Sequence, residues 1–203
     1  TTAASRPIAS ATSPAHRVIL EKLRAAQREH LFQIRDVCFL PEGELHSRSE
    51  GSTPYELARD ESRYPLKRIV AAAELASNLE PGALPELQRL SADPDSAVRY
   101  WAALGFLMRG QVAVASHADA LRTALGDTSP YVRMVAAEAL GLHGRQGDRA
   151  AALTVLRALA PPDKNGVFVA MSALAVIETL GANAASLHGF VTNLNASGPS
   201  PDV

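Results

Sequence analysis

The sequence predicts an all-α protein built as a stack of paired helices, and three observations indicate this fold class. First, the phrase D-P-D-S-A-V-R-Y-W-A-A-L-G-F at 93–106 returns as D-T-S-P-Y-V-R-M-V-A-A-E-A-L at 127–140, a shift of 34 residues, and periods of this size are typical of stacked supersecondary units. Second, the apolar residues within each copy recur at helical spacing. Third, the chain is 47% hydrophobic but only 5% aromatic, which suits closely packed helices with small side chains between them.

A long helix is the first element that we expect, over residues 13–36. Ser13 offers an N-cap and Pro14 suits the first helical position. Its apolar face consists of Ile19, Leu20, Leu23, Ala26, Leu31 and Ile34. His30 falls at the edge of that face, where we expect a structural histidine. Residues 1–12 are small and polar, and composition predicts that they form a disordered lead.

Residues 37–52 are predicted to form an extended linker loop. Loops of this length inside a compact domain are often functional. The densest polar set in it comprises Glu42, His46, Arg48 and Glu50. We expect Glu42, His46 and Arg48 to contact either a substrate or a neighbouring domain, and the alternative is a solvated charged loop.

A stack of helix pairs is predicted over 53–195. It begins at a capping box, Thr53-Pro54-Tyr55-Glu56, with proline at the first helical position. Proline, glycine and the repeat register then place the pairs near 53–61 with 65–78, 83–91 with 95–109, 116–125 with 129–143, and 149–160 with 163–180. A last helix near 183–195 would cover the open end, as atypical terminal units do. The remaining residues, 196–203, are predicted to be a disordered tail.

The repeated phrase resembles HEAT repeats. The residues that carry this resemblance are the loop aspartates Asp93 and Asp127, the helix arginines Arg99 and Arg133, and the alanine pairs that follow each arginine. The resemblance covers about residues 53–195 and implies an α-solenoid. It also implies that these aspartates and arginines form a structural ladder between neighbouring repeats and do not bind a ligand.

The first 80 residues carry a second resemblance. P-A-H-R-V-I-L-E-K-L-R at 14–24 is similar to a helix near the end of bacterial sulfatases. Further on, R-D at 35–36, F-L-P-E at 39–42, G-S-T-P-Y-E at 51–56 and A-A-A-E-L-A-S at 71–77 resemble a group akin to heparan N-sulfatase, which carries a HEAT-like C-terminal extension. Cys38 departs from that pattern, which has glycine there.

The sulfatase resemblance implies an activity that this chain does not complete by itself. Such enzymes hydrolyse sulfate esters or sulfamates with a formylglycine beside a calcium ion, and the formylglycine is made in a C/S-x-P/A-x-R setting. Cys38 is followed by Phe39-Leu40-Pro41, so the motif is missing and we expect an ordinary thiol. The resemblance therefore implies no cofactor in this chain and a missing upstream catalytic domain as its partner. It also implies sulfated glycan as a possible ligand and a periplasmic or secreted location, although no signal peptide is visible.

Charge and composition weigh against several other classes. Twenty basic and 21 acidic side chains give a net charge of −1, whereas nucleic-acid binders usually carry a basic excess. The longest apolar run, 167–177, is too short to span a bilayer, so we expect no membrane span. A single cysteine excludes a disulfide framework within the chain.

Three functions stay open at this point. The first is an accessory C-terminal region of an exported sulfatase, which packs on the catalytic domain. The second is a free-standing HEAT scaffold that binds a protein partner. The third is a HEAT-like enzyme acting on nucleic acid, which the balanced charge disfavours.

Overall fold

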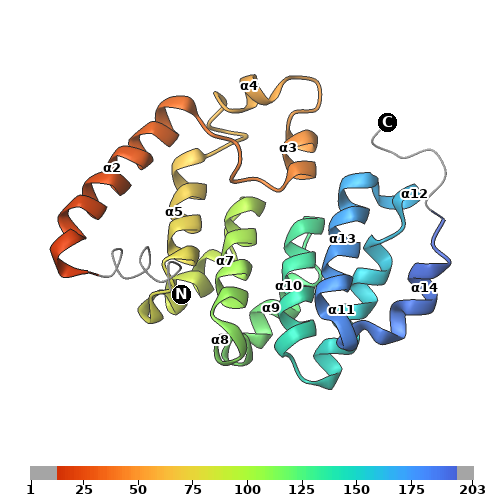
Figure 1. Cartoon of the computed structure of the whole chain (residues 1–203). Helices are drawn as coiled ribbons and strands as arrows, with labels where there is room; N and C mark the ends of the chain where they lie inside the picture. Colours follow the sequence, from red (N-terminus) through yellow and green to blue (C-terminus); the bar gives the residue numbers. More distant parts are fainter. Residues whose placement is uncertain (1–12, 196–203) are drawn as a thin grey trace, which may run out of the picture.

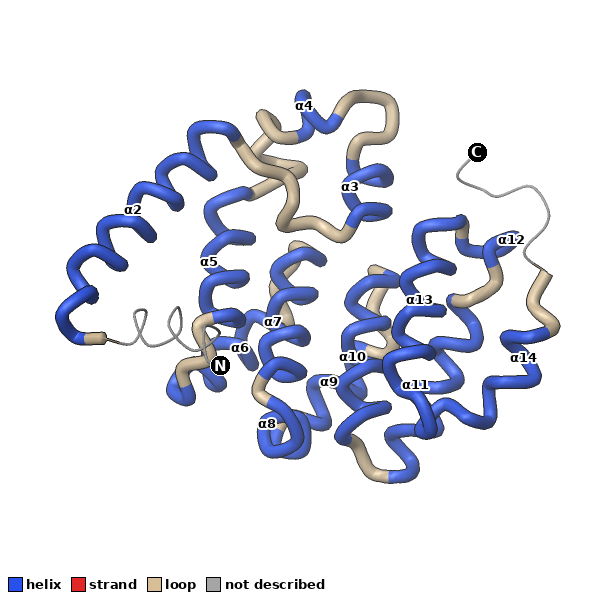
Figure 2. Tube along the Cα trace, in the orientation of Figure 1, coloured by secondary structure: helices blue, strands red, loops and turns tan. Residues whose placement is uncertain are grey.

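The computed structural model describes residues 13–195, and that part of the chain consists of helices and connecting turns without any strand (Figures 1 and 2). This confirms the all-α class. The expected disordered lead, 1–12, and the expected tail, 196–203, lie outside the described residues. The elements are η1 (Pro14–His16), α2 (Arg17–Ile34), α3 (Glu42–Arg48), α4 (Pro54–Leu57), α5 (Leu66–Ser77), η2 (Pro81–Ala83), α6 (Leu84–Leu90), α7 (Ser96–Met108), α8 (Gly110–Ser116), α9 (Ala118–Ala124), α10 (Pro130–His143), α11 (Gln146–Leu159), α12 (Pro162–Asn165), α13 (Val167–Leu180), η3 (Gly181–Leu187) and α14 (His188–Thr192).

The main body is a row of long helices in chain order. Helix α5 packs on α7, α7 on α10, and α10 on α13, and Figure 1 shows these helices side by side. The intervening α6, α9 and α11 each pack on the next long helix, on α7, α10 and α13 respectively. This alternation gives two layers of helices, and the buried residues form two clusters, a larger one from the end of α5 to η3 and a smaller one around Leu57, Tyr64 and Ile69.

The core is aliphatic, as the low aromatic content requires. Fully buried side chains include Phe106, Leu87, Leu140 and Leu156. Small residues bring the helices close together: a Cβ added to Gly141 would lie 2.7 Å from Leu180 Cδ2. Helix α10 therefore packs on the end of α13 without room for a side chain at this position.

The alanine pairs lie entirely inside the stack. Ala102 and Ala136 are 0% exposed, and Ala103 and Ala137 are 4% and 0% exposed. Both alanines of each pair are therefore enclosed by neighbouring helices. The reason is that α7 and α10 each have long helices on both sides, as well as a helix of the second layer.

Replacing Ala137 by leucine is expected to lower the free energy of unfolding by about 1–3 kcal/mol, because three additional carbon atoms would be forced into the closely packed contact between α10 and its neighbouring helices. Ala150→Leu, on the exposed side of α11, is the matched control and should leave the urea midpoint nearly unchanged. Equal midpoints for the two variants would contradict this packing of α10.

Two short helices change the predicted outline. Residues 42–48, expected within an extended loop, form α3, and α8 was not expected at all. In α3, the acids Glu42 and Glu44 occupy the first turn and the bases His46 and Arg48 the last, which is the order that the helix dipole favours. A helix of only seven residues gives too weak a periodic signal to be recognised from the sequence.

The segment before α3 is fastened to the body by two hydrogen bonds. The Tyr64 hydroxyl donates to the Asp36 carbonyl at 2.6 Å, and Trp101 Nε1 donates to the Phe39 carbonyl at 3.0 Å. Tyr64 is fully buried, and burial raises the pKa of its hydroxyl, so it stays a neutral donor. These bonds fix where α3 begins.

One apolar stretch meets the length and composition criteria for a membrane span. Residues Val167–Thr192 contain an 18-residue window with a mean hydropathy of 1.6, whereas the sequence analysis expects no run long enough. In the structure the stretch is divided into α13, η3 and α14. Helix α13 packs on α10 and α11 through Ala170, Ala173, Ile177 and Leu180, which are buried.

Candidate functional site

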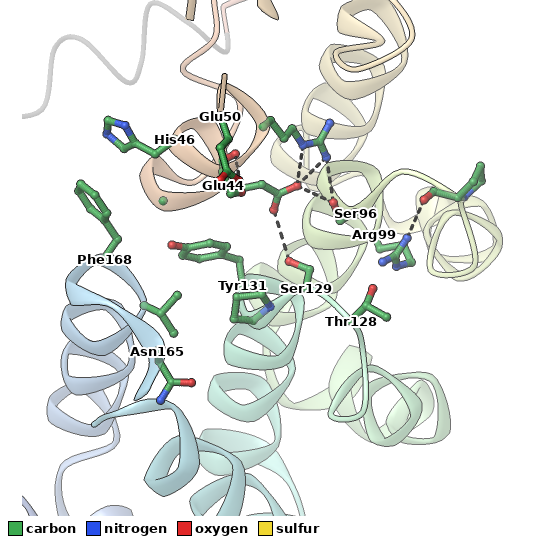
Figure 3. Close-up of a pocket in the computed structure, with 16 residues that line it drawn as sticks. Glu44, His46, Glu50, Ser96, Arg99, Thr128, Ser129, Tyr131, Asn165 and Phe168 are labelled. Carbon is green, nitrogen blue, oxygen red and sulfur yellow. Dashed lines mark hydrogen bonds and ion pairs between the residues drawn. The ribbon is translucent and has the colours of Figure 1, made fainter. Parts of the chain in front are cut away.

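Helix α3 lies against the N-terminal ends of α7 and α10, and a cluster of polar side chains joins the three helices (Figure 3). Its centre is Glu44, which is only 5% exposed. The Glu44 carboxylate accepts hydrogen bonds from Ser96 Oγ at 2.5 Å and from Ser129 Oγ at 3.3 Å. One carboxylate of α3 thus holds the first residue of α7 and the N-cap residue of α10.

Arg48 pairs with this carboxylate one helical turn later. Its Nε and Nη2 donate to Glu44 Oε1 at 3.0 and 2.5 Å. Its Nη1 and Nη2 also donate to the two carboxylate oxygens of Asp95, each at 3.0 Å, and Nη1 reaches the Arg63 carbonyl at 2.9 Å. Every guanidinium nitrogen of Arg48 therefore has acceptors within the protein.

The cluster is buried and charged. Side-chain exposure is 15% for Arg48, 7% for Glu44 and 11% for Asp95. Burial favours a higher pKa for Asp95, but the hydrogen bonds and charge of Arg48 outweigh it and lower the pKa. Burial favours a lower pKa for Arg48, but Asp95 and Glu44 outweigh it and raise the pKa. Asp95 and Arg48 therefore stay ionised near neutral pH.

The three polar residues predicted as contacts lie differently on α3. Arg48 faces inward in the cluster. Glu42 and His46 are exposed and face each other across one turn, 4.0 Å apart. Sequence reasoning missed Glu44, Asp95, Ser96 and Ser129 as members of the site. The one signal for Glu44 was its spacing of four residues from Arg48, which places the two on one helical face.

An open groove of about 860 Å³ lies beside the cluster. It is bounded by α3 and by the N-terminal ends of α7, α10 and α13. At its rim the His46 ring stacks on Phe168, with centroids 4.6 Å apart and planes 18° from parallel. Figure 3 shows this pair on one side of the groove, with Ser129 and Thr128 on the other. The volume falls in the usual range for ligand sites.

Gly43 lets α3 lie close to α10 and α13 at one side of the groove. A Cβ added there would lie 2.7 Å from the Phe168 Cβ and would also meet the Tyr131 ring. Real Cβ contacts are longer, so any larger residue would push α3 away from α10 and α13. The close approach of backbone at Gly43 is what sets the depth of the groove.

Arginines and aspartates also join successive helices of the stack. Arg68 pairs with Asp93 at 2.8 Å. Arg99 donates to both oxygens of Asp127 at 2.7 Å, and Arg122 pairs with Asp148 at 2.6 Å. Arg99 also donates to the Asp93 carbonyl at 2.8 Å.

Arg133, the fourth residue expected in the ladder, differs from Arg99. Its Nε is buried without a hydrogen-bond acceptor among residues 13–195. Arg99 meets an aspartate 28 residues later, whereas the same step from Arg133 reaches Pro161. The loss of that aspartate explains why the series of pairs stops before α13.

Cys38 is exposed, and its hydrogen bond with the Asp36 carboxylate and the charge of that group raise the pKa of the thiol. A raised pKa disfavours the nucleophilic thiolate. Within the described part of the chain, no group of three or more His, Cys, Asp or Glu side chains is arranged to hold a metal ion.

Acid should weaken the Arg–Asp contacts. The hydrogen bonds and charge of Arg48 and Arg99 hold the pKa of Asp95 and Asp127 below the ordinary 3.8. A depressed folded-state pKa gives stability that is present above the unfolded value and is lost as pH falls through the folded value. We expect the urea midpoint to fall once the pH drops below about 4.

Asp127→Asn should flatten that acid dependence, whereas Asp119→Asn, at a fully exposed carboxylate, should leave it as in the parent protein. A urea midpoint that stays constant from pH 7 to pH 3 would contradict the assignment.

Comparisons with protein families, curated proteins and solved structures find no family model, no curated protein and no solved structure that matches this chain.

Proposed function

We propose that this chain is an accessory interaction region of a sulfatase-type hydrolase acting on sulfated glycans, with the catalytic domain upstream of it. In this proposal residues 13–36 end the sulfatase-type domain, 37–52 connect it, and 53–195 form a HEAT-like α-solenoid. The chain itself supplies contacts and no catalytic group, and the calcium ion and formylglycine belong to the upstream domain. Export to the periplasm or the medium is part of the same proposal.

The orientation of α2 is the observation that carries the proposal. At about 3.6 residues per turn, Ile19, Leu23, Ala26, His30 and Ile34 fall on one face of the helix. That face points to solvent: Ile19, Leu23 and Ile34 are 57%, 63% and 52% exposed. No residue of α2 is buried.

The opposite face of α2 carries the contacts with the rest of the chain. Arg28 pairs with Glu74 of α5 at 3.3 Å and lies over the Phe32 ring. Phe32 packs beside the core cluster that includes Leu40 and Tyr64. The half-buried residues of α2 are the apolar Leu20, Leu31 and Phe32, so α2 contacts the body along a narrow strip and leaves its apolar outward face uncovered.

A helix with an exposed apolar face of this kind favours a partner. An isolated helix of 18 residues is marginal in water, and exposed apolar patches mark interaction sites. The outward face lies in the segment that resembles the helix near the end of bacterial sulfatases. The uncovered face and the resemblance therefore favour the same partner, the upstream catalytic domain.

Helix α3 has a structural part in this proposal. The cluster of Glu44, Arg48 and Asp95 clamps the connection between α2 and the stack onto the ends of α7 and α10. A clamp of this kind would transmit a fixed orientation from the catalytic domain to the solenoid. Glu42, on the exposed side of α3, is in a position to contact that domain.

The test compares one substitution in two settings. In the chain of residues 1–203, Leu23→Asp should leave the free energy of unfolding nearly unchanged because Leu23 is already exposed. In the natural protein with its upstream domain, the same change should cost more than about 2 kcal/mol, because a leucine buried at the interface is lost.

The matched control is Ala25→Asp, which adds the same charge to an exposed position on another face of α2. It should be tolerated in both settings. A reading frame without a C/S-x-P/A-x-R motif upstream, or equal effects of Leu23→Asp in the two settings, would contradict the proposal. The second outcome would favour a free-standing scaffold.

A further inference from the structure

The groove beside α3 has a chemistry of its own, separate from the outward face of α2. Its two guanidinium groups are already committed, since Arg48 binds Glu44 and Asp95 and Arg99 binds Asp127. The carboxylates that line the groove are Glu44, which Arg48 neutralises, and Glu50, which is exposed. A sulfate or carboxylate group would therefore meet no uncommitted arginine and would be repelled by Glu50.

The neutral polar side chains of the groove mainly offer acceptors. Ser129 donates its hydroxyl hydrogen to Glu44. The Asn165 amide donates to the carbonyls of Ala158 and Pro161 at 2.9 and 3.1 Å, so its Oδ1 is left to accept. A matching ligand must bring hydrogen-bond donors and no negative charge.

The aromatic rim adds a flat apolar platform. His46 and Phe168 stack nearly parallel, and His46 is more than half exposed. A pyranose ring presents an apolar C–H face with hydroxyl donors around its edge, which fits an aromatic face next to acceptors. A basic peptide would need exposed carboxylates to bind. Glu44 is buried and already paired with Arg48, so Glu50 is the main carboxylate of the groove that such a peptide could reach, and the groove fits a basic peptide less well than a sugar.

We propose that this groove binds an uncharged stretch of an oligosaccharide, with a sugar ring on the His46–Phe168 pair and its hydroxyls donating to Asn165, Ser129 and Glu50. This inference rests on the proposed function and refines it: the accessory region holds unsulfated sugar units, while sulfate groups are recognised elsewhere.

The experiment uses the full chain of 203 residues and three uncharged hexasaccharides, of the cello-, malto- and N-acetylchito- series, followed by NMR titration. At least one should bind with a dissociation constant in the millimolar range or tighter, with little dependence on salt. A heparin hexasaccharide of the same length should bind at least tenfold more weakly than that sugar.

His46→Ala and Phe168→Ala should each weaken the neutral sugar at least fivefold, and His46→Phe should restore binding because it keeps the platform. The control is Met171→Ala. Met171 is exposed and lies on α13, like Phe168, but outside the groove, so this variant should bind the sugar as the parent protein does. Because His46 is exposed, its variant tests the site without disturbing the fold.

Binding of none of the three sugars, stronger binding of the heparin fragment, or salt-sensitive binding of an arginine-rich nonapeptide in place of sugar would each overturn the inference. None of these results depends on the outward face of α2, so the proposed docking function would stand or fall by its own test.

Discussion

Arg48→Ala is expected to lower the free energy of unfolding by about 3–5 kcal/mol, the usual effect of removing one partner from a buried ion pair. The substitution leaves Glu44 and Asp95, both nearly inaccessible to solvent, without the guanidinium that neutralises them. It also removes a donor to the Arg63 carbonyl. Urea unfolding followed by circular dichroism measures the change.

Arg89→Ala is the matched control for this prediction. Arg89 makes a similar pair with Glu86 at 2.6 Å, but both side chains are largely exposed, and exposed pairs contribute little. Its unfolding midpoint should stay close to that of the parent protein. If the two variants unfold at the same urea concentration, Arg48 is not a clamp and the account of α3 is wrong.

Phe106→Ala should cost about 3–5 kcal/mol, because truncating a buried aromatic side chain removes apolar contact and leaves a cavity. Phe106 is 0% exposed and stacks on His117 with ring centroids 4.5 Å apart. Thermal and urea unfolding should both register the loss.

Phe106→Leu provides the comparison. Leu140 occupies the corresponding position in the second copy of the repeated phrase and is equally buried. The leucine variant should therefore retain most of the stability that the alanine variant loses. Equal losses for both would show that Phe106 acts through its ring contacts and that the two positions are not equivalent.

The helical class and the long helices could be predicted from the sequence because their signals are local. The capping box at Thr53 and the prolines at helix starts each act within a few residues, and the helical spacing of apolar residues is complete within each copy of the repeated phrase. The capping box is present in the structure, with Thr53 and Glu56 exchanging hydrogen bonds. Such features depend little on the rest of the fold.

The candidate site was less predictable because its contacts are distant in sequence. Glu44 meets Ser96 and Ser129, which are 52 and 85 residues away, and no local pattern marks these serines as partners. Arg48 was expected to face a ligand or domain, but the position of Asp95 turns it inward. The groove likewise exists only because Gly43 lets α3 approach Phe168.

The outward face of α2 shows another limit of prediction from the sequence. Of the apolar residues predicted to share one face, Leu20 and Leu31 are half-buried, whereas Ile19, Leu23 and Ile34 are exposed. Periodicity does not reveal which part of an apolar face the rest of the chain covers, and in the structure Arg28 on the other side of the helix pairs with Glu74 of α5. The direction of a helix face is set by tertiary contacts.

Hydrogen–deuterium exchange of α2 tests the central claim most directly. The backbone amides of Arg17–Ile34 would be compared in the chain of residues 1–203 and in a protein that also carries the proposed upstream catalytic domain. We predict fast exchange in the chain alone, since α2 has few tertiary contacts, and at least a hundredfold slower exchange in the longer protein, where the proposed domain would cover the outward face. Equal exchange rates in the two proteins would contradict the claim that α2 docks this region on a catalytic domain.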